Sequence, residues 1–339
     1  MENSDIKNIS VLGFGSWGIA LALQLYKNGY NVTAYQRSRE KCERIRADGV
    51  SAEYLPGTKI PPEIKLTSDI ADTAGSDMVI FTAGSKATRE LAERIKPFAA
   101  ENQIFVNASK GLEPGTNKRM SEVIKDVIPG AVRVAAMSGP CHAEELCAGI
   151  ASAYVAASPD PETAKAIQNV FMSKEFRIYT NPDIIGVELG GALKQCIAMS
   201  VGICDGMGYG DNTRAVLITR GIVEISRLGL AMGAKIETFS GLSGIGDLVV
   251  TCTSELSRNK RAGFYIGQGM SLQEALDKVK MIVEAVNNVG PALAFAKKHN
   301  IEMPITEELY KVLYEGKDPK MTVKSLMERD RTDERVLLI

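Results

Sequence analysis

A single lysine lies in an otherwise apolar helical stretch in the second half of the chain. Lys194 is the only charged residue between Leu189 and Ile203, and a lysine is rarely buried without a partner. Desolvation lowers the pKa of an ammonium group toward the range in which it exchanges protons near neutral pH. Gly190 lies one turn earlier on the same face, so its missing side chain leaves room for a ligand beside the ammonium. Lys194 is therefore a candidate proton donor; the alternative is a lysine that extends from a domain–domain helix to water.

An acid and two phosphate-binding side chains follow this helix along the chain. Asp247 comes directly after a glycine-dense turn, where it can orient the lysine, bind a substrate hydroxyl, or simply cap the next helix. Arg258 and Asn259 lie in a run of basic and amide residues, and together they can hold a phosphate group. A solvated charged surface is the alternative interpretation of such a run. The residue types therefore favour acid–base work on a small anionic substrate.

The N-terminal segment carries the pattern of a phosphate-binding loop. An apolar run at residues 9–12 enters the sequence G-x-G-x-x-G at Gly13, Gly15 and Gly18, and an amphipathic helix follows. Glycine suits the tight turn at the first position, the close approach of a pyrophosphate at the second, and helix–strand packing at the third. The helix N-terminus offers its unpaired N–H groups to the phosphates. The strand before the loop and the helix after it favour a dinucleotide site over an ordinary βα turn.

The residues that end the second expected strand indicate which dinucleotide is bound. Arg37 lies 24 residues beyond Gly13, and no acid follows the strand until Glu40. An acid at this place favours the ribose hydroxyl of NAD, whereas an arginine suits the 2′-phosphate of NADP. The guanidinium of Arg37 offers several donors to a phosphate, and a solvated surface arginine is the alternative. We expect NADPH to be preferred and NADH to be the weaker cofactor.

Strands and helices must hold these groups in place, and in the first half of the chain they alternate. This alternation predicts parallel strands with right-handed crossovers and a ligand crevice at their carboxyl ends. Lys110 and residues 138–143 follow two of these strands at that edge. The expected strands are residues 9–12, 31–36, 78–82, 103–107, 133–136, 151–156 and 176–179, and the expected helices are residues 17–28, 39–48, 86–98 and 161–171.

Helical periodicity replaces this alternation after residue 181. Pro182 disfavours helix at the preceding residue and is well suited to start one, and from Glu188 onward there is hardly any strand signal. The sequence thus predicts the α/β class, with an N-terminal Rossmann-type doubly wound sheet in residues 1–181 and an all-α C-terminal domain in residues 182–339. We expect the active site at the cleft between them.

The composition argues against several other kinds of protein. The 40 basic and 41 acidic residues balance, so nothing favours nucleic acid or an anionic membrane surface as a partner. The polar N-terminus lacks the pattern of a signal peptide, and no run reaches the roughly 18 apolar residues of a membrane span. Six scattered cysteines and two histidines give no metal motif. Buried thiols in a cytoplasmic enzyme are the expectation, and the apolar helical half suggests a homodimer.

Taken together, these segments resemble the bacterial NAD(P)-dependent glycerol-3-phosphate dehydrogenases. The resemblance follows the chain in order and covers nearly all of it, so the set is far more specific than any one piece. The family reduces dihydroxyacetone phosphate to sn-glycerol 3-phosphate, which feeds glycerophospholipid synthesis. The matching segments are residues 13–18, 55–57, 107–113, 138–143, 188–194, 219–221, 238–248 and 251–259.

The resemblance also implies roles for individual residues. Lys194 matches the catalytic lysine, and Lys110 matches a second lysine close to cofactor and substrate. The other positions implied for the substrate are Gly139, Cys141, Asp247, Ser257, Arg258 and Asn259. The positions implied for the cofactor are Gly13, Gly15, Ser16, Trp17, Gly18, Arg37, Lys110, Ala143, Arg258, Ile282 and Glu284.

Two departures from the family pattern and two alternative functions stay open. Cys141 and His142 replace the usual serine and phenylalanine, and a thiol is a weaker hydrogen-bond donor than a hydroxyl. Ala285 replaces a usual glycine. A two-domain reductase of β-hydroxy acids or sugar acids shares the architecture and the lysine, but the cluster of Ser257, Arg258 and Asn259 favours a phosphate ester over a bare carboxylate. A noncatalytic dinucleotide sensor would need no proton donor.

Overall fold

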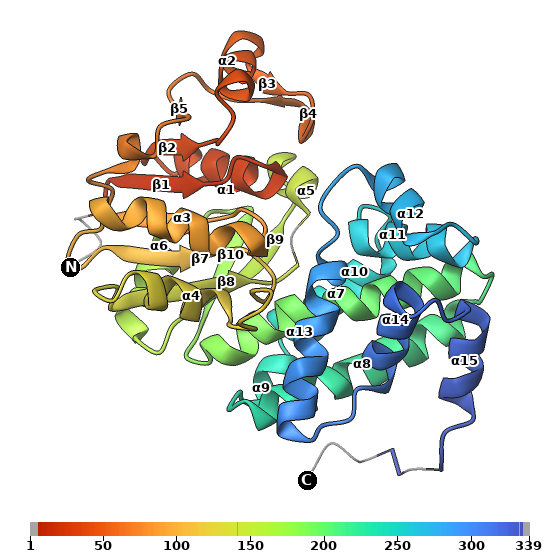
Figure 1. Ribbon diagram of the computed structural model, residues 1–339. Coiled ribbons are helices and arrows are strands. Elements are labelled where there is room, and N and C mark those ends of the chain that lie inside the picture. The colour runs from red at the N-terminus through yellow and green to blue at the C-terminus, as the bar shows by residue number, and fades with distance from the viewer. Residues whose placement is uncertain (1–5, 141, 332, 335–339) are drawn as a thin grey trace. The chain divides into compact units, whose positions relative to one another are not determined.

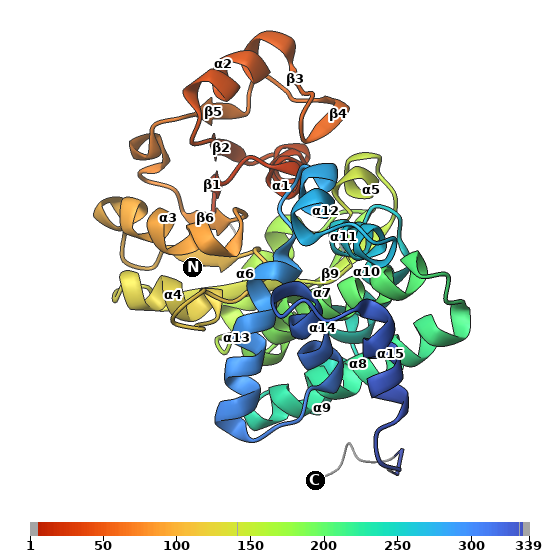
Figure 2. The same ribbon diagram turned by 45° about the vertical axis from the view of Figure 1, so that its right-hand side comes forward.

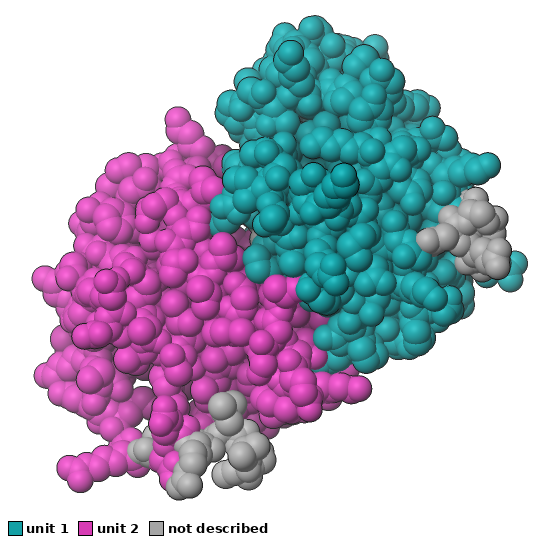
Figure 3. Space-filling view, turned by 180° about the vertical axis from the view of Figure 1, so that it is seen from behind, with its two compact units in different colours: residues 1–109, 120–184 teal, residues 110–119, 185–339 magenta. Residues whose placement is uncertain are grey.

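The computed structural model describes residues 6–140, 142–331 and 333–334. The chain forms two compact units, coloured teal and magenta in Figure 3. Unit 1 comprises residues 1–109 and 120–184, and unit 2 comprises residues 110–119 and 185–339. The chain therefore leaves unit 1 for a short segment, returns to it, and only later continues into the rest of unit 2.

Unit 1 is built on an eight-stranded sheet (Figure 1). Across the sheet the strands are β5 (Lys65–Thr67), β2 (Asn31–Tyr35), β1 (Asn8–Leu12), β6 (Met78–Phe81), β7 (Ile104–Asn107), β8 (Arg133–Ser138), β9 (Ser152–Ala157) and β10 (Phe176–Asn181). Every neighbouring pair in this sheet is parallel except β8 and β9. A mostly parallel, Rossmann-like sheet is therefore confirmed.

The antiparallel pair of β8 and β9 departs from the expected parallel pairing. The connection between them contains one short helix, α5 (Ala143–Cys147). Five helical residues rise about 7.5 Å, whereas the six residues of β8 span about 20 Å. Within its described residues the connection therefore contains no helix as long as β8 that could pack along the sheet as a crossover, and the next strand runs in the opposite direction.

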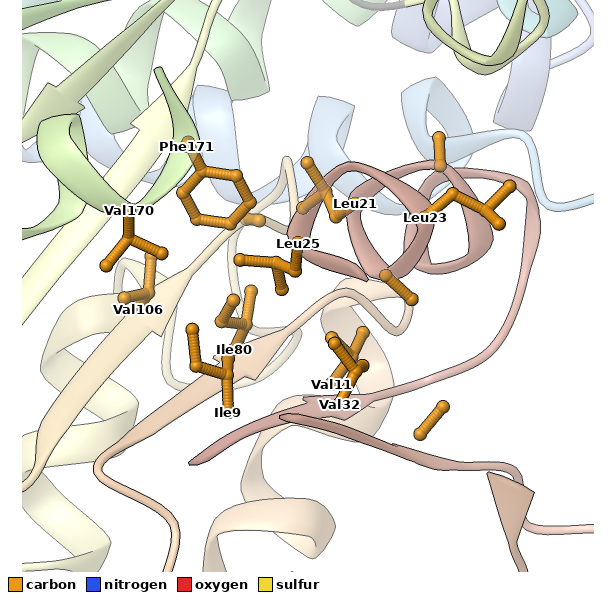
Figure 4. Close-up of a cluster of buried hydrophobic side chains, with 14 of the residues drawn as sticks. Ile9, Val11, Leu21, Leu23, Leu25, Val32, Ile80, Val106, Val170 and Phe171 are labelled. Carbon is orange, nitrogen blue, oxygen red and sulfur yellow. The ribbon is translucent and has the colours of Figure 1, made fainter. Parts of the chain in front are cut away.

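Helices cover both faces of this sheet (Figure 1, Figure 2). Apolar side chains of α1 (Ser16–Lys27) and α6 (Pro161–Phe171) share one buried cluster with the strands, and Figure 4 shows part of it. Side chains of α3 (Thr88–Ile95) and α4 (Met120–Val127) form a second buried cluster with other strand residues. The sheet is thus buried on both sides, as a parallel sheet requires.

The longer elements of unit 1 lie where their sequence pattern places them. α2 (Arg39–Asp48) has the expected bounds, and it begins after Ser38, whose hydroxyl accepts a hydrogen bond from Lys41 N–H at 3.2 Å. The pattern did not predict the small hairpin of β3 (Val50–Ser51) and β4 (Leu55–Lys59), nor β5, α4 and α5. These elements are two to eight residues long, and β3, β4 and β5 lack the continuous apolar run that marks the equally short strands β6 and β7.

The described residues of unit 2 beyond residue 184 are helical, as expected. The helices are α7 (Ile184–Gly206), α8 (Asp211–Ala231), α9 (Ile236–Phe239), α10 (Asp247–Thr253), α11 (Arg258–Gly267), α12 (Leu272–Val279), α13 (Glu284–His299), α14 (Pro304–Tyr314) and α15 (Pro319–Met327). A π-helical turn, Leu242–Gly246, leads into α10. α13 and α14 pack against each other and against α8 (Figure 1, Figure 2).

The long helix α7 forms the centre of unit 2. Among the helices of the described residues, α7 is the one that is long and apolar enough to cross a membrane, judged by length and composition. The sequence analysis did not anticipate such a helix. However, 89% of its most apolar window is buried inside the protein. Its side chains Leu189, Leu193 and Ile197 share an apolar cluster with residues of α8 and α13. α7 is therefore the core helix of this unit.

Candidate active site

Two lysines meet on one buried carboxylate in unit 2. Asp247, the first residue of α10, is fully buried, and Lys110 Nζ donates to its Oδ2 at 2.7 Å. Lys194 Nζ donates to Asp247 Oδ1 and to Thr251 Oγ1, and only 4% of its side chain is exposed. Thr251 Oγ1 in turn donates to the Asp247 carbonyl at 2.6 Å. The carboxylate of Asp247 thus receives two ammonium groups, one on each oxygen, and holds Lys194 in a buried place.

Sequence reasoning anticipated most of this cluster but missed Thr251. The structure places Lys110, Lys194 and Asp247 together, and the carboxylate of Asp247 receives both lysines instead of capping α10, which has no side-chain cap. Thr251 lies four residues after Asp247 on the same helix, a spacing that puts both side chains on one face. That spacing was the available signal.

The expectation that Gly190 leaves room for a ligand is wrong. A Cβ at this position of α7 would collide with the backbone carbonyl oxygen of Ser243. The turn that precedes Asp247 therefore packs directly on α7, and the glycine is needed for this contact between two backbones. The close approach brings the carboxylate to the lysine.

The thiols around Lys194 are not nucleophiles. Burial raises the pKa of Cys252 to about 12, although the nearby charge of Lys194 opposes this shift. Burial likewise raises the pKa of Cys196 to about 12. Within the part of the chain that the structure describes, no group of three or more His, Cys, Asp or Glu side chains could hold a metal ion. The chemistry of this cluster therefore belongs to its lysines and its carboxylate.

The start of α11 carries the expected phosphate-binding residues. Ser257 caps this helix by accepting a hydrogen bond from Lys260 N–H at 3.3 Å, and the first turn contains no acid. Arg258 is exposed, whereas Asn259 is buried and accepts a hydrogen bond from Ala285 N–H at 3.0 Å. A helix N-terminus with an arginine beside it attracts an anion through both its dipole and its charge.

Lys260 belongs to the same basic run but points the other way. Its buried ammonium group donates to Glu255 at 2.6 Å and lies 3.6 Å from Asp205 of α7. Lys260 therefore links the segment that precedes α11, which contains Glu255, to α7, which contains Asp205. The compact basic cluster expected from the sequence thus separates into an exposed arginine and an inward lysine.

Glycines fix α11 closely against α7. A Cβ at Gly263 would collide with the Met199 carbonyl oxygen, and a Cβ at Gly202 would collide with the Lys260 carbonyl oxygen. Because backbones touch at these positions, the start of α11 has a fixed place relative to the helix that carries Lys194.

Unit 1 carries a loop whose geometry fits a dinucleotide phosphate. Gly13 has a φ of 110°, which side chains rarely adopt, and a Cβ at Gly18 would collide with the Gly13 carbonyl oxygen. A Cβ at Gly15 would meet nothing within 4 Å. The loop therefore turns tightly, lets α1 approach β1, and leaves open space at its middle glycine, so it fits a bound pyrophosphate.

Three further positions expected at the cofactor lie around this loop. Ser16 Oγ donates to the Tyr54 carbonyl at 2.9 Å, which ties α1 to the small hairpin. The ring of Trp17 packs against Tyr154 with centroids 5.2 Å apart. Arg37 is exposed directly beyond β2. An exposed arginine at the end of this strand is compatible with a 2′-phosphate.

Both parts of the chain match models of one enzyme family. Residues 8–164 match the model described as NAD-dependent glycerol-3-phosphate dehydrogenase N-terminus, and residues 183–324 match the corresponding C-terminus. The chain belongs to the NAD-dependent glycerol-3-phosphate dehydrogenase family. The resemblance seen in the sequence is thereby confirmed.

Relatives of this dehydrogenase match it over nearly its whole length. The glycerol-3-phosphate dehydrogenase [NAD(P)+] of Moorella thermoacetica is 51% identical, with 97% of this chain and 98% of the relative covered. The enzyme of the same name from Thermoanaerobacter is 48% identical, with 96% and 98% covered. The crystal structure of the Coxiella burnetii glycerol-3-phosphate dehydrogenase superposes with a TM-score of 0.92 at 37% identity, covering 96% and 99% of the two chains. The chain is thus an oxidoreductase that uses NAD(P).

The remaining expected site residues of this dehydrogenase are divided between the two units. In unit 1, Gly139 has a φ of 149°, and a Cβ there would lie 2.8 Å from the Tyr154 ring; Ala143 is the buried first residue of α5. In unit 2, Ile282 is exposed, and Glu284 is buried at the start of α13. Cys141 lies outside the described residues.

Proposed function

We propose that this dehydrogenase reduces dihydroxyacetone phosphate to sn-glycerol 3-phosphate at the expense of NADPH, with Lys194 as the proton donor. The observation that carries this assignment is the buried cluster of Lys194, Asp247 and Lys110. A noncatalytic sensor would have no use for an ammonium group held in this way. Family membership supplies the substrate class, because the relatives are glycerol-3-phosphate dehydrogenases by name.

The residues of unit 2 divide the work of reduction. Arg258, Asn259 and Ser257 bind the substrate phosphate, and this remote binding orients the C2 carbonyl. When bound, the NADPH cofactor would supply the hydride for this reduction. Lys194 stabilises the negative charge that grows on the carbonyl oxygen and gives that oxygen its proton. The balanced reaction consumes one substrate, one NADPH and one proton.

Asp247 and Lys110 keep the proton donor in place throughout this step. Asp247 receives Lys194 and Lys110 on different oxygens, so it stays paired with Lys110 when Lys194 becomes neutral. The second ammonium also adds positive potential near the developing oxyanion. Lys110 therefore assists without exchanging the proton itself.

From unit 1, Gly139 and Cys141 remain proposed contacts of the substrate, and Ala143 remains a proposed contact of the cofactor.

The first test is the loss of NADPH absorbance when dihydroxyacetone phosphate is added, with NADH in parallel. We expect rapid oxidation of NADPH and slower oxidation of NADH. Tight NADPH binding without turnover of this substrate would contradict the assignment and favour a reductase of sugar acids or hydroxy acids. Replacing the substrate by unphosphorylated dihydroxyacetone provides the control, because it removes the group that Arg258 and Asn259 would bind.

Replacing Arg258 with alanine is expected to lower kcat/KM for dihydroxyacetone phosphate by about 10- to 100-fold, the value of one charge-assisted hydrogen bond to a phosphate. Turnover of unphosphorylated dihydroxyacetone should change little. Arg261→Ala, one turn further along α11, is the matched control and should leave both values near those of the unaltered enzyme. Equal losses with both substrates would show that Arg258 does not bind the phosphate.

Arg37→Asp is expected to lower the ratio of kcat/KM for NADPH to that for NADH by about 10- to 100-fold, since it replaces a donor to the 2′-phosphate by a repelling carboxylate. Arg44→Asp makes the same charge change on the exposed face of α2 and should not alter this ratio. An unchanged ratio in the Arg37 variant would remove this residue from the cofactor site.

We also assign the reaction to the cytoplasm and to the supply of glycerophospholipid precursors. The described cysteines Cys42, Cys147, Cys196, Cys204 and Cys252 are free thiols, which suits a reducing compartment. Cofactor contacts by Ile282 and Glu284, and association into a homodimer, stay predictions from the sequence.

A further inference from the structure

Asn288 connects the segment that carries Lys110 to the helix that carries Lys194. This residue of α13 is fully buried. Its Oδ1 accepts a hydrogen bond from Leu112 N–H at 3.0 Å, and its Nδ2 donates to the Ala192 carbonyl at 3.1 Å. Leu112 lies two residues after Lys110, and Ala192 lies two residues before Lys194. One planar amide therefore links two backbones, each within two residues of an ammonium group of the active site.

The segment 110–119 depends on such links. The residues before and after it in the chain belong to unit 1, whereas the segment itself packs in unit 2. Leu112 is fully buried in the apolar cluster that includes Leu189 and Leu193 of α7. At the other end of the segment, Arg119 donates to Glu188 of α7 at 2.7 Å. The segment is thus held at both ends, and Asn288 holds the end that carries Lys110.

The amide of Asn288 suits this place because it must donate and accept at once. The Leu112 N–H is buried and needs an acceptor, and the Ala192 carbonyl lies in the middle of a helix, where a second acceptor site remains for a side-chain donor. An apolar side chain of similar volume could fill the space but would form neither bond. The sequence analysis did not single out this position, because an amide within a helical pattern of α13 gives no chemical signal.

We propose that Asn288 is a positioning residue for the active site, which keeps Lys110 at the carboxylate that it shares with Lys194. The proposal rests on the function assigned above, and Asn288 acts through its hydrogen bonds to the backbone of Leu112 and Ala192. Without this amide, the Leu112 backbone loses its hydrogen-bonded link to Ala192 of α7, and we expect the ammonium of Lys110 to shift away from Asp247. Small displacements of this kind in a catalytic group reduce the rate strongly.

A double-mutant cycle between Asn288 and Lys110 tests the proposal. We expect Asn288→Ala to lower kcat/KM for dihydroxyacetone phosphate about 10-fold while the Kd for NADPH stays within about 2-fold. In a Lys110→Met background the same replacement should change kcat/KM by less than about 2-fold, because the group that Asn288 positions is already gone. A merely structural role would reduce activity by the same factor in both backgrounds, and this result would overturn the proposal.

Two further variants separate positioning from stability. Asn288→Leu keeps the side-chain volume but forms neither hydrogen bond, so it leaves no cavity of the kind that alanine leaves. It should change kcat/KM by the same factors as Asn288→Ala in both backgrounds, and it serves as the test if Asn288→Ala does not fold. Thr306→Val removes another buried hydrogen bond of unit 2, from Thr306 to Glu224 at 3.1 Å, and should lower the unfolding temperature without changing kcat/KM. If neither Asn288 variant folds, the residue is structural and the proposal fails. If the unaltered enzyme does not reduce dihydroxyacetone phosphate, the proposed function fails instead.

Discussion

Replacing Lys194 with methionine is expected to lower kcat by about 10²-fold or more, the usual effect of losing a general acid, while NADPH binds as before. Methionine keeps the length and the apolar stem of the side chain but cannot donate a proton. Asp247 is left with Lys110, which lies 2.7 Å from it, so the carboxylate does not become an unpaired buried charge. The measurement is the steady-state rate at saturating dihydroxyacetone phosphate, together with the Kd for NADPH from its fluorescence.

A second carboxylate that binds two lysines provides a matched control for this variant. Glu308 of α14 is 9% exposed at its side chain and pairs with Lys311 at 2.8 Å and with Lys317 at 2.5 Å. Lys317→Met therefore removes one lysine from a similar arrangement that has no part in the proposed reaction. It should leave kcat unchanged. If Lys194→Met also retains nearly the full kcat, then Lys194 is not the proton donor.

Replacing Gly263 with alanine is expected to reduce the free energy of unfolding by about 2 kcal/mol, a typical cost of forcing atoms into a packed core. The new Cβ would collide with the Met199 carbonyl oxygen, and a backbone cannot rotate away as a side chain can. The better helix propensity of alanine offsets only part of this cost. We expect the unfolding temperature to fall by roughly 4–8 °C, whereas Arg261→Ala on the same helix should shift it little.

The same replacement should also change the kinetics in a specific way. α11 begins with Arg258 and Asn259, so displacement of this helix from α7 moves the residues that we propose to bind the phosphate relative to Lys194. We expect the KM for dihydroxyacetone phosphate to rise more than the Kd for NADPH, because most of the positions expected to bind the cofactor lie in unit 1 and only Arg258 lies on α11. Unfolding at the same temperature as the unaltered enzyme would contradict this account of the helix contact.

Elements with a clear apolar pattern were predictable from the sequence, including the four-residue strands β6 and β7, whereas short elements without such a pattern were not. The strand–glycine–helix pattern at β1 and α1 and the capped helix α2 depend on local signals that lie within about a dozen residues. The direction of β9 depends instead on the length of the connection through α5, and five residues carry no visible period. The α/β sheet followed by helices, the family and the enzyme class are confirmed, because they depend on the ordered set of segments.

The candidate site was predictable where side-chain chemistry was unusual for its surroundings. Lys194 is a lone charge in an apolar helix, and Asp247 follows a dense run of glycines, so both were recognisable. Thr251 and Asn288 are ordinary polar residues within helices, and their importance lies in buried hydrogen bonds that only the packed structure specifies. Gly190 was misread because a missing side chain looks the same in sequence whether a ligand or another backbone approaches it.

The segment 110–119 affects the order in which parts of the protein can fold during synthesis. Its buried partners come much later in the chain, since Leu112 precedes Asn288 by 176 residues and Arg119 precedes Glu188 by 69. At about 5–20 residues per second, a ribosome needs roughly 10–35 s to deliver Asn288 after Leu112 has been synthesised. Arg119 gains its partner Glu188 after 69 further residues, and Lys110 gains its partner Asp247 only after 137. The lysine cluster can therefore form only after Asp247 and Thr251 have been synthesised, so a chain truncated before α10 cannot assemble it.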